Sequence, residues 1–186
     1  MRHPHCPRCG APTRVAHLEG RPRDRCAACG RVWYDCAKPC ATAVVEDATG
    51  RVLLVRRGQP PHEGLWNLPG GFLEADEHPE AGARREALEE TGFEVRLTGL
   101  LGVYVDHHAE PGDETRSHHS LSLAYTAVIV GGGWRPSEES TEHAFFRPDE
   151  LPPEAEIAYA NHRATLLDWR TARAGRGFRQ PPDLLP

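Results

Sequence analysis

Long hydrophobic runs are missing from this chain of 186 residues, and so is a strong excess of basic charge. No stretch approaches the roughly 20 apolar residues that a membrane-spanning helix needs, and no apolar core of a signal peptide follows the first five residues. The 22 basic and 27 acidic side chains give a net charge of −5, which argues against a dedicated nucleic-acid-binding protein. We therefore expect a cytoplasmic protein without membrane contact, and we do not expect nucleic acid as a partner.

The composition that is present fits a globular domain with a small appendage. Hydrophobic residues make up 39% and charged residues 26% of the chain, as in ordinary folded proteins. Residues 1–36 are rich in Cys, Pro, Gly and Arg and have almost no apolar periodicity, and modules this short usually need metal or disulfides to fold. We predict a small module over 1–36, a main domain over 37–172 and a flexible tail over 173–186.

Four of the six cysteines form two closely spaced pairs, each followed by a glycine: Cys6, Cys9, Cys26 and Cys29. Disulfides are rare in the cytoplasm, and a two-residue spacing lets two thiolates reach one tetrahedral ion. The pattern therefore predicts a Zn²⁺ site and a zinc ribbon. The alternative is a set of free cysteines in an unstructured arm. Cys36 and Cys40 fall outside the pattern, and we expect them to be small buried residues.

A zinc ion closed by four thiolates has no open position, so this metal is expected to be structural. The module is also locally basic, through Arg8, Arg14, Arg21, Arg23, Arg25 and Arg31. Two interpretations of these arginines stay open, an ordinary solvated surface and a face that binds nucleic acid.

Strands and helices alternate in the remaining sequence. Strands are predicted over 41–45, 51–56, 94–106, 121–130 and 143–147, with polar loops over 107–119 and 131–141. A helix is predicted over 79–91, capped by His78 and stopped by Gly92. A second helix is predicted over 157–170, with Ala160, Ala164, Leu166 and Leu167 on its buried side. This order favours an α/β fold or an α+β sandwich.

The first of these helices carries an unusual acidic face. At about 100° per residue, Glu86, Glu89 and Glu90 lie on one side, where like charges repel. Gly82 precedes them by one turn, although a mid-helix glycine costs about 1 kcal/mol relative to alanine. Two local rules are broken at one place, which is typical of a functional site.

Clustered carboxylates are hard ligands that suit Mg²⁺ or Mn²⁺ shared with substrate phosphates. Arg85 lies four residues before Glu89 and can fix it by a bidentate contact, and Glu77 can reach back over the same face. The alternative is an acidic surface that only contacts solvent.

The segment from Gly71 to Phe93 resembles the Nudix family, whose box is G-x5-E-x7-R-E-U-x-E-E-x-G-U with U a bulky apolar residue. All fixed positions match, and Ala87 is a smaller residue than the first U requires. The resemblance extends over roughly residues 40–170. A ribbon before such a domain is similar to the zinc-bearing branch related to NADH pyrophosphatases and ADP-ribose pyrophosphatases.

This resemblance implies an α/β/α sandwich with a mixed sheet, and hydrolysis of a nucleoside diphosphate linked to another group. The implied ligands of Mg²⁺ or Mn²⁺ are Glu86, Glu89 and Glu90 with a backbone carbonyl near Gly71, and Arg85 and Glu77 orient them. Family members recruit a further glutamate from a later loop. Glu142 is the first candidate for that role here and Glu139 the second. The water-activating base stays open among Glu89, Glu90 and Glu142.

The substrate is expected to be a small nucleotide diphosphate, with ADP-ribose or a related sugar or dinucleotide diphosphate as the first hypothesis. FAD, NAD(H) and a modified nucleoside triphosphate are alternatives. Residues 94–130 lack the S-Q-P-W segment of NADH pyrophosphatases, and Pro111 is poorly spaced for the proline of ADP-ribose-cleaving members. Arg56 and Arg57 are candidate phosphate ligands or an exposed strand end. A non-catalytic nucleotide sensor and a homodimer are further hypotheses.

Overall fold

The computed structural model describes residues 3–110 and 113–175, without the side chains of 109–116. The chain divides into two compact units, one formed by residues 1–37 with 108–119 and the other by 38–107 with the residues from 120 onward. Pro111 and the tail beyond residue 175 lie outside the described residues. Within the described ranges, neither helix combines the length and the hydropathy needed to cross a bilayer.

The first unit contains a small antiparallel sheet of β1 (Thr13–Leu18), β2 (Arg21–Cys26) and β3 (Val32–Trp33), with β2 in the centre. The two cysteine pairs lie at the turns before β1 and after β2. Few side chains of this unit are fully buried, and two of those are Cys6 and Cys26. Its core is thus built around the cysteines, as expected for a module too short for a hydrophobic interior.

A mixed sheet forms the second unit, in the order β10-β5-β4-β9-β8. Its strands are β4 (Lys38–Glu46), β5 (Val52–Arg57), β8 (Phe93–Glu110), β9 (Asp113–Gly132) and β10 (Ser140–Phe146), with β6 (Trp66–Asn67) paired to β5 and β7 (Gly70–Phe72) paired to β4. β4 runs parallel to β9 and antiparallel to β5 and β7. The parallel pair identifies the sheet as mixed.

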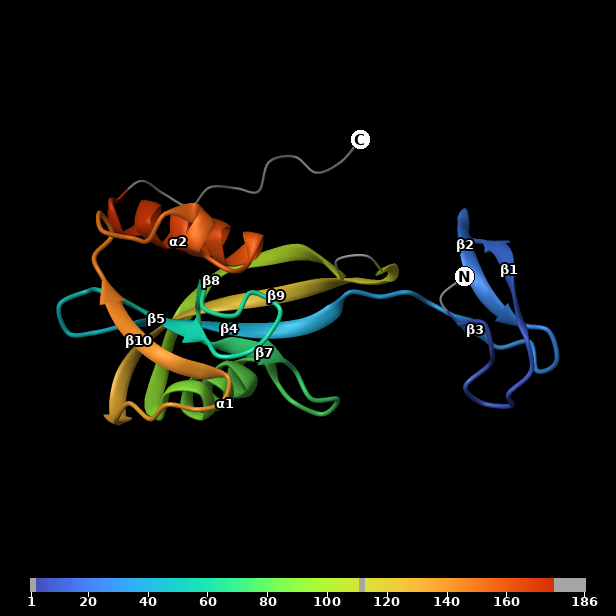
Figure 1. The fold of residues 1–186 in the computed structure, drawn as a ribbon, viewed down its shortest axis with the longest axis horizontal. Coiled ribbons are helices and arrows are strands. Elements are labelled where there is room, and N and C mark those ends of the chain that lie inside the picture. The colour runs from blue at the N-terminus through green and yellow to red at the C-terminus, as the bar shows by residue number, and fades with distance from the viewer. Residues whose placement is uncertain (1–2, 111–112, 176–186) are drawn as a thin grey trace. The chain divides into compact units, whose positions relative to one another are not determined.

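Helices cover both faces of this sheet (Figure 1), α1 (Pro79–Thr91) on one and α2 (Ala160–Arg173) on the other, with a short 3₁₀ turn, η1 (Glu154–Glu156), before α2. Alternate residues of the strands point to opposite faces of the sheet and form two hydrophobic cores. On one face, Val44 and Leu54 pack with Leu166 and Trp169 of α2. Ala43, Val45 and Leu53 pack with Ala87 of α1. The expected α/β/α sandwich with a mixed sheet is therefore confirmed.

Three sequence-based expectations are wrong in detail. The polar segment 107–119 is not a loop, because β8 continues to Glu110 and β9 starts at Asp113. Hydrophobic alternation marks only the part of a hairpin that packs on a core, so its polar end gave no signal. In α2 the buried side consists of Asn161, His162, Thr165, Leu166 and Trp169, whereas Ala160, Ala164 and Leu167 are exposed. Cys36 is exposed as well, contrary to expectation.

Candidate active site

Helix α1, which carries the acidic face, packs against β4 and β7. His78 caps the helix by accepting a hydrogen bond from the backbone of Glu80 at 3.4 Å, and Pro79 takes the first position. Gly92 ends it with φ 75°, and its N–H donates to the Leu88 carbonyl at 2.8 Å. Both helix ends match the prediction. They fix the rotation of the helix and thereby the side on which its glutamates lie.

Two glycines allow the carboxylates of this segment to approach the backbone. A Cβ atom on Gly71 would lie 2.6–2.9 Å from the carboxylate atoms of Glu86. A Cβ atom on Gly82 would lie 2.3 Å from Leu73 Cδ2 and 3.0 Å from Glu77 Oε2. The helix interior therefore carries a glycine because the preceding loop packs directly against it, which explains the unfavourable helix propensity at this position.

Arg85 connects the loop and the helix. Its Nε and Nη2 donate to the two carboxylate oxygens of Glu77, each at 2.8 Å. Its Nη1 donates to Glu86 at 2.7 Å and to Glu89 at 2.8 Å, and its Nη2 also reaches the Phe72 carbonyl at 3.1 Å. The bidentate contact expected at Glu89 is made to Glu77 instead. Glu77 thus locks the guanidinium group, which in turn positions two carboxylates of the helix.

The protonation equilibria of these glutamates differ strongly. The hydrogen bonds from Arg85 lower the pKa of Glu77 to about 2. Burial raises the pKa of Glu86, and it raises the pKa of Glu90, which is 6% exposed, well above its usual value of 4.5. Repulsion from Glu86 and Glu139 adds to the rise at Glu90, and repulsion from Glu89 and Glu139 adds to the rise at Glu86, which Arg85 partly offsets. Burial and the neighbouring carboxylates therefore disfavour the negatively charged forms of Glu86 and Glu90.

One oxygen of this cluster has no partner. Glu90 Oε2 is buried and forms no hydrogen bond with any described residue. A buried carboxylate oxygen without a donor is costly unless a proton or a cation compensates it. The donor set consists of carboxylate oxygens, which suit Mg²⁺ or Mn²⁺, so the residues present fit such a cation.

A pocket of about 300 Å³, here called the acidic pocket, opens at this face of the helix. Its lining residues are Gln59, Glu86, Glu89, Glu90, Ser137, Glu138 and Glu139. Four of these glutamates were expected as metal ligands or as candidates for that role, namely Glu86, Glu89, Glu90 and Glu139. Glu138 lines the pocket in addition. Sequence reasoning missed Gln59, Ser137 and Glu138, although two adjacent acids in a turn just before a strand were a usable signal.

Of the two later glutamates considered, the structure brings Glu139 rather than Glu142 to the pocket. The Glu139 carbonyl accepts a hydrogen bond from Gly58 N at 2.8 Å, which holds the turn beside the end of β5. Glu142 does not line the pocket and forms an ion pair with Arg56 at 2.8 Å. The structure thus places Glu139, the second candidate, at the pocket and Glu142, the first candidate, beside Arg56, and the role of either glutamate stays a prediction. A bulge between Ser140 and Glu142 shifts the strand register, and it could not be read from the sequence.

The two arginines that end β5 have different environments. Arg56 donates to Glu142 and, at 2.6 Å, to the Gly64 carbonyl, and its guanidinium lies 4.2 Å from the Trp66 ring centre. Arg57 lies over the ring of Tyr159 at 5.1 Å and donates to the carbonyls of Pro61 at 2.8 Å and Gln59 at 3.4 Å. Burial raises the pKa of Glu90, and the charge of Arg57 offsets a part of that rise. Both arginines are thus held by neighbouring groups, and Arg57 contacts the backbone of Gln59, a residue that lines the acidic pocket.

The four paired cysteines converge in the other unit. One sulfur from each residue lies within 4.8 Å of all the others, with Cys6 and Cys29 Sγ at 3.8 Å and Cys9 and Cys26 Sγ at 3.6 Å. The Cys29 N–H donates to Cys26 Sγ at 3.3 Å, and such backbone donation lowers the pKa of Cys26 to about 6. The cluster can hold one tetrahedral metal ion. Among the described residues, no set of carboxylate oxygens is clustered as closely as the four sulfurs. A Mg²⁺ or Mn²⁺ ion that is also bound by substrate phosphates does not require such a complete set of protein ligands.

The sequence profile of the NUDIX domain matches residues 37–169. The ADP-ribose pyrophosphatase of Methanocaldococcus jannaschii is 34% identical over 125 residues, which cover 67% of this chain and 69% of the relative. The NAD-capped RNA hydrolase NudC of Deinococcus radiodurans is 31% identical over 169 residues, which cover 89% of this chain and 56% of the relative. The crystal structure of a NUDIX hydrolase from Nitrosomonas europaea matches with a TM-score of 0.76 and 27% identity, covering 95% of this chain and 96% of that one.

Proposed function

This chain belongs to the Nudix hydrolase family, and on that basis we propose that it hydrolyses the diphosphate linkage of a nucleoside diphosphate joined to a second group, with Mg²⁺ or Mn²⁺ as cofactor. The reaction releases a nucleoside monophosphate. The observation that carries the proposal is the acidic pocket, where Glu86, Glu89, Glu90 and Glu139 meet and one buried oxygen of Glu90 has no partner.

The chain's own residues divide the work in this proposal. Glu86, Glu89 and Glu90 would hold the cations together with the backbone near Gly71. Cations bound there would neutralise charge on the diphosphate and lower the pKa of a water molecule. Arg85, locked by Glu77, keeps the helix carboxylates in place.

Glu139 faces the helix across the pocket and replaces Glu142 as the proposed further ligand or water-activating base. Arg57 is the proposed phosphate ligand, because it contacts the backbone of Gln59 at the edge of the acidic pocket. The role of Arg56 as a second phosphate ligand requires it to leave Glu142.

The substrate that we place first is ADP-ribose or a related sugar or dinucleotide diphosphate. The relative from Methanocaldococcus jannaschii supports this choice, and the relative named NAD-capped RNA hydrolase keeps NAD-type diphosphates as an alternative. FAD and modified nucleoside triphosphates complete the set of candidates. All of them contain the diphosphate that the acidic pocket and Arg57 would bind.

A substrate panel tests the proposal. The full chain is incubated with Mg²⁺ and each of ADP-ribose, NAD⁺, NADH, FAD and nucleoside triphosphates, and the products are separated by chromatography. We expect a nucleoside monophosphate from at least one diphosphate-linked substrate, and its release about 10²–10³-fold more slowly from the Glu90→Gln variant. Tight nucleotide binding without turnover of any substrate would instead identify a sensor and overturn the enzymatic proposal.

A further inference from the structure

Two aromatic residues in contact with each other both occupy unfavourable local positions. Tyr159 precedes the first residue of α2 and makes no capping hydrogen bond, although Ser, Thr, Asp and Asn are preferred there. His62 has φ 65°, a left-handed conformation that residues with a side chain rarely adopt. The centres of the two rings are 5.2 Å apart at an angle of 87°, and the pair is here called the aromatic corner. Two broken local rules at one contact are typical of a functional site.

The aromatic corner adjoins the acidic pocket through Arg57. The guanidinium group of Arg57 lies 5.1 Å from the ring centre of Tyr159, and its Nη2 donates to the carbonyl of Gln59, which lines the pocket. Burial raises the pKa of Tyr159, the charge of Arg57 offsets a part of that rise, and the charge of Glu90 adds to it. His62 is exposed and Tyr159 is only partly buried. A nucleotide with its phosphates in the acidic pocket can therefore bring the neighbouring group against these rings.

Hydrogen-bond acceptors lie beside the aromatic corner. Asn161 is 8% exposed, and its Oδ1 forms no hydrogen bond with any described residue. The backbone N–H of Asn161 donates to Asp106 Oδ2 at 3.3 Å, and burial and, to a smaller extent, the charge of Asp106 raise the pKa of Tyr159. A buried oxygen without a donor is costly unless a ligand supplies one. The negative charge of Asp106 repels phosphate, so a neutral group that donates a hydrogen bond suits this position.

We propose that the aromatic corner binds the base of the nucleotide and that Asn161 Oδ1 accepts a hydrogen bond from the amino group of that base. Bases stack on aromatic side chains, and two rings at nearly a right angle can receive a planar base on the face of one ring beside the edge of the other. Adenine carries an amino group where hypoxanthine carries a carbonyl oxygen, so the chain should prefer adenine nucleotides. This inference rests on the proposed function, because it takes the acidic pocket as the site of the phosphates.

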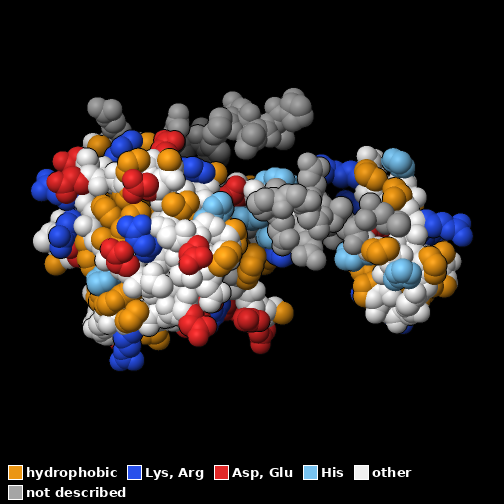
Figure 2. Space-filling view, viewed as in Figure 1, with side chains coloured by type: hydrophobic (Ala, Val, Ile, Leu, Met, Phe, Trp, Pro, Cys, Tyr) orange, Lys and Arg blue, Asp and Glu red, His pale blue; other side chains and the backbone are white. Residues whose placement is uncertain are grey.

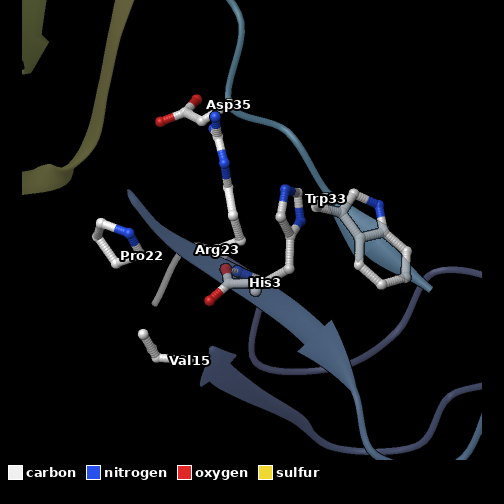
Figure 3. A pocket seen from close by; sticks show the side chains of 7 residues that line it. His3, Val15, Pro22, Arg23, Trp33 and Asp35 are labelled. Atoms are coloured by element: carbon white, nitrogen blue, oxygen red, sulfur yellow. Dashed lines mark hydrogen bonds between the residues drawn. The ribbon is translucent and has the colours of Figure 1, made fainter. Parts of the chain in front are cut away.

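A pocket in the first unit is the other place where a base could stack. It has a volume of about 280 Å³, and His3, Arg23, Asp24 and Trp33 are among the residues that line it (Figure 3). Asp24 already accepts a hydrogen bond from the backbone N–H of His3 at 2.9 Å, and the buried side-chain atom without a described partner is the donor Arg23 Nε. An amino group needs an acceptor, so this pocket suits it less. Acidic and basic side chains are interspersed over the second unit (Figure 2), so charge alone does not select the site of the base.

Isothermal titration calorimetry of the full chain with Mg²⁺ tests the proposal with three probes, AMP, IMP and ribose 5-phosphate. We expect AMP to bind about tenfold more tightly than either of the others, because IMP leaves the buried acceptor unpaired and ribose 5-phosphate lacks the base. Tyr159→Leu should weaken AMP binding about tenfold by removing a stacking surface, whereas Tyr159→Phe keeps the ring and should bind AMP like the wild type. Asn161→Leu should reduce the preference for AMP over IMP to about threefold or less, and it should melt at the same or a higher temperature, because a buried acceptor without a partner is removed.

The matched control is Tyr34→Leu, which removes an exposed tyrosine from the first unit and should bind AMP like the wild type. Melting temperatures are measured for every variant, and His62→Asn replaces Tyr159→Leu if the latter does not fold, because asparagine tolerates the left-handed conformation. Equal binding of AMP and ribose 5-phosphate, no binding of AMP, or a preference for AMP over IMP that survives in Asn161→Leu would overturn the inference. The expected binding pattern in a protein that hydrolyses none of the substrates would refute the proposed function alone and support this inference.

Discussion

At the scale of single residues, the glutamates of the acidic pocket favour function at the expense of stability. Glu86 and Glu90 are buried beside each other's charge. We expect Glu90→Gln and Glu86→Gln to lower turnover about 10²–10³-fold, as for the loss of one electrostatic element of a transition state. Without added Mg²⁺, both variants should melt at the same or a higher temperature, because a repulsion of a few tenths of a kcal/mol is relieved.

Glu80→Gln is the control for these variants. Glu80 lies on the same helix but is exposed and does not line the pocket. Its substitution should change turnover little. If Glu80→Gln and Glu90→Gln were equally damaging, the acidic face would be ordinary surface.

The raised pKa of Glu90 also predicts a pH dependence of stability. In the unfolded chain this carboxyl loses its proton near pH 4.5, whereas in the folded chain burial keeps the proton to higher pH. Between these two values the folded state binds more protons, so the free energy of unfolding falls as pH rises through the folded pKa. Thermal melts without added divalent cation should show this fall in the wild type and a smaller one in Glu90→Gln. Identical pH profiles would contradict the assignment.

The two later glutamates give a third test at this scale. Glu139 lines the acidic pocket and Glu142 pairs with Arg56. We expect Glu139→Gln to lower kcat at least tenfold with saturating Mg²⁺, whereas Glu142→Gln should change kcat less than threefold, since a surface ion pair contributes about 0–1 kcal/mol. The measurement is kcat of both purified variants. A larger loss of kcat in Glu142→Gln than in Glu139→Gln would identify Glu142 as the further ligand or base.

At the scale of secondary-structure elements, the junction of loop and helix depends on Gly82. Alanine has the higher helix propensity by about 1 kcal/mol, but its Cβ would lie 2.3 Å from Leu73 and 3.0 Å from Glu77 Oε2. We therefore expect Gly82→Ala to lower both the melting temperature and turnover, because the ends of the Leu73 and Glu77 side chains must shift and the displaced Glu77 no longer locks Arg85.

The neighbouring exposed position provides the control. Ala81→Gly makes the opposite change at a site open to solvent. It should cost about 1 kcal/mol of stability through propensity and leave turnover unchanged. A stabilising effect of Gly82→Ala would show that the loop does not pack against the helix in solution.

At the scale of the whole molecule, the two units should have separate metal requirements. The four sulfurs of the cysteine cluster can hold one tetrahedral ion, while the acidic pocket offers hard oxygen ligands. We expect one zinc ion per chain after purification without added zinc, and its loss in Cys26→Ser. Turnover of both proteins should still require added Mg²⁺ or Mn²⁺. Wild-type turnover without added cation that disappears with the zinc would contradict this division.

Local spacing determined much of this protein by itself. The cap at His78, the stop at Gly92 and the 3.6-residue period between them sufficed to predict α1 from Pro79 to Thr91 and the shared face of its three glutamates. Two short cysteine pairs sufficed to predict a cluster. The contacts that define helix α1 connect residues a few positions apart. The two cysteine pairs repeat one short spacing that is typical of metal binding.

Only the tertiary structure decided the contacts between distant segments. The antiparallel pairing of β10 with β5, with its bulge after Ser140, brings Glu139 to the pocket and leaves Glu142 with Arg56. The buried side of α2 includes His162, whose Nδ1 accepts a hydrogen bond from the backbone of Leu68, so polar groups lie where apolar periodicity predicted none. Register and helix rotation depend on the sum of many weak packing contacts across the fold, and no short stretch of sequence encodes that sum.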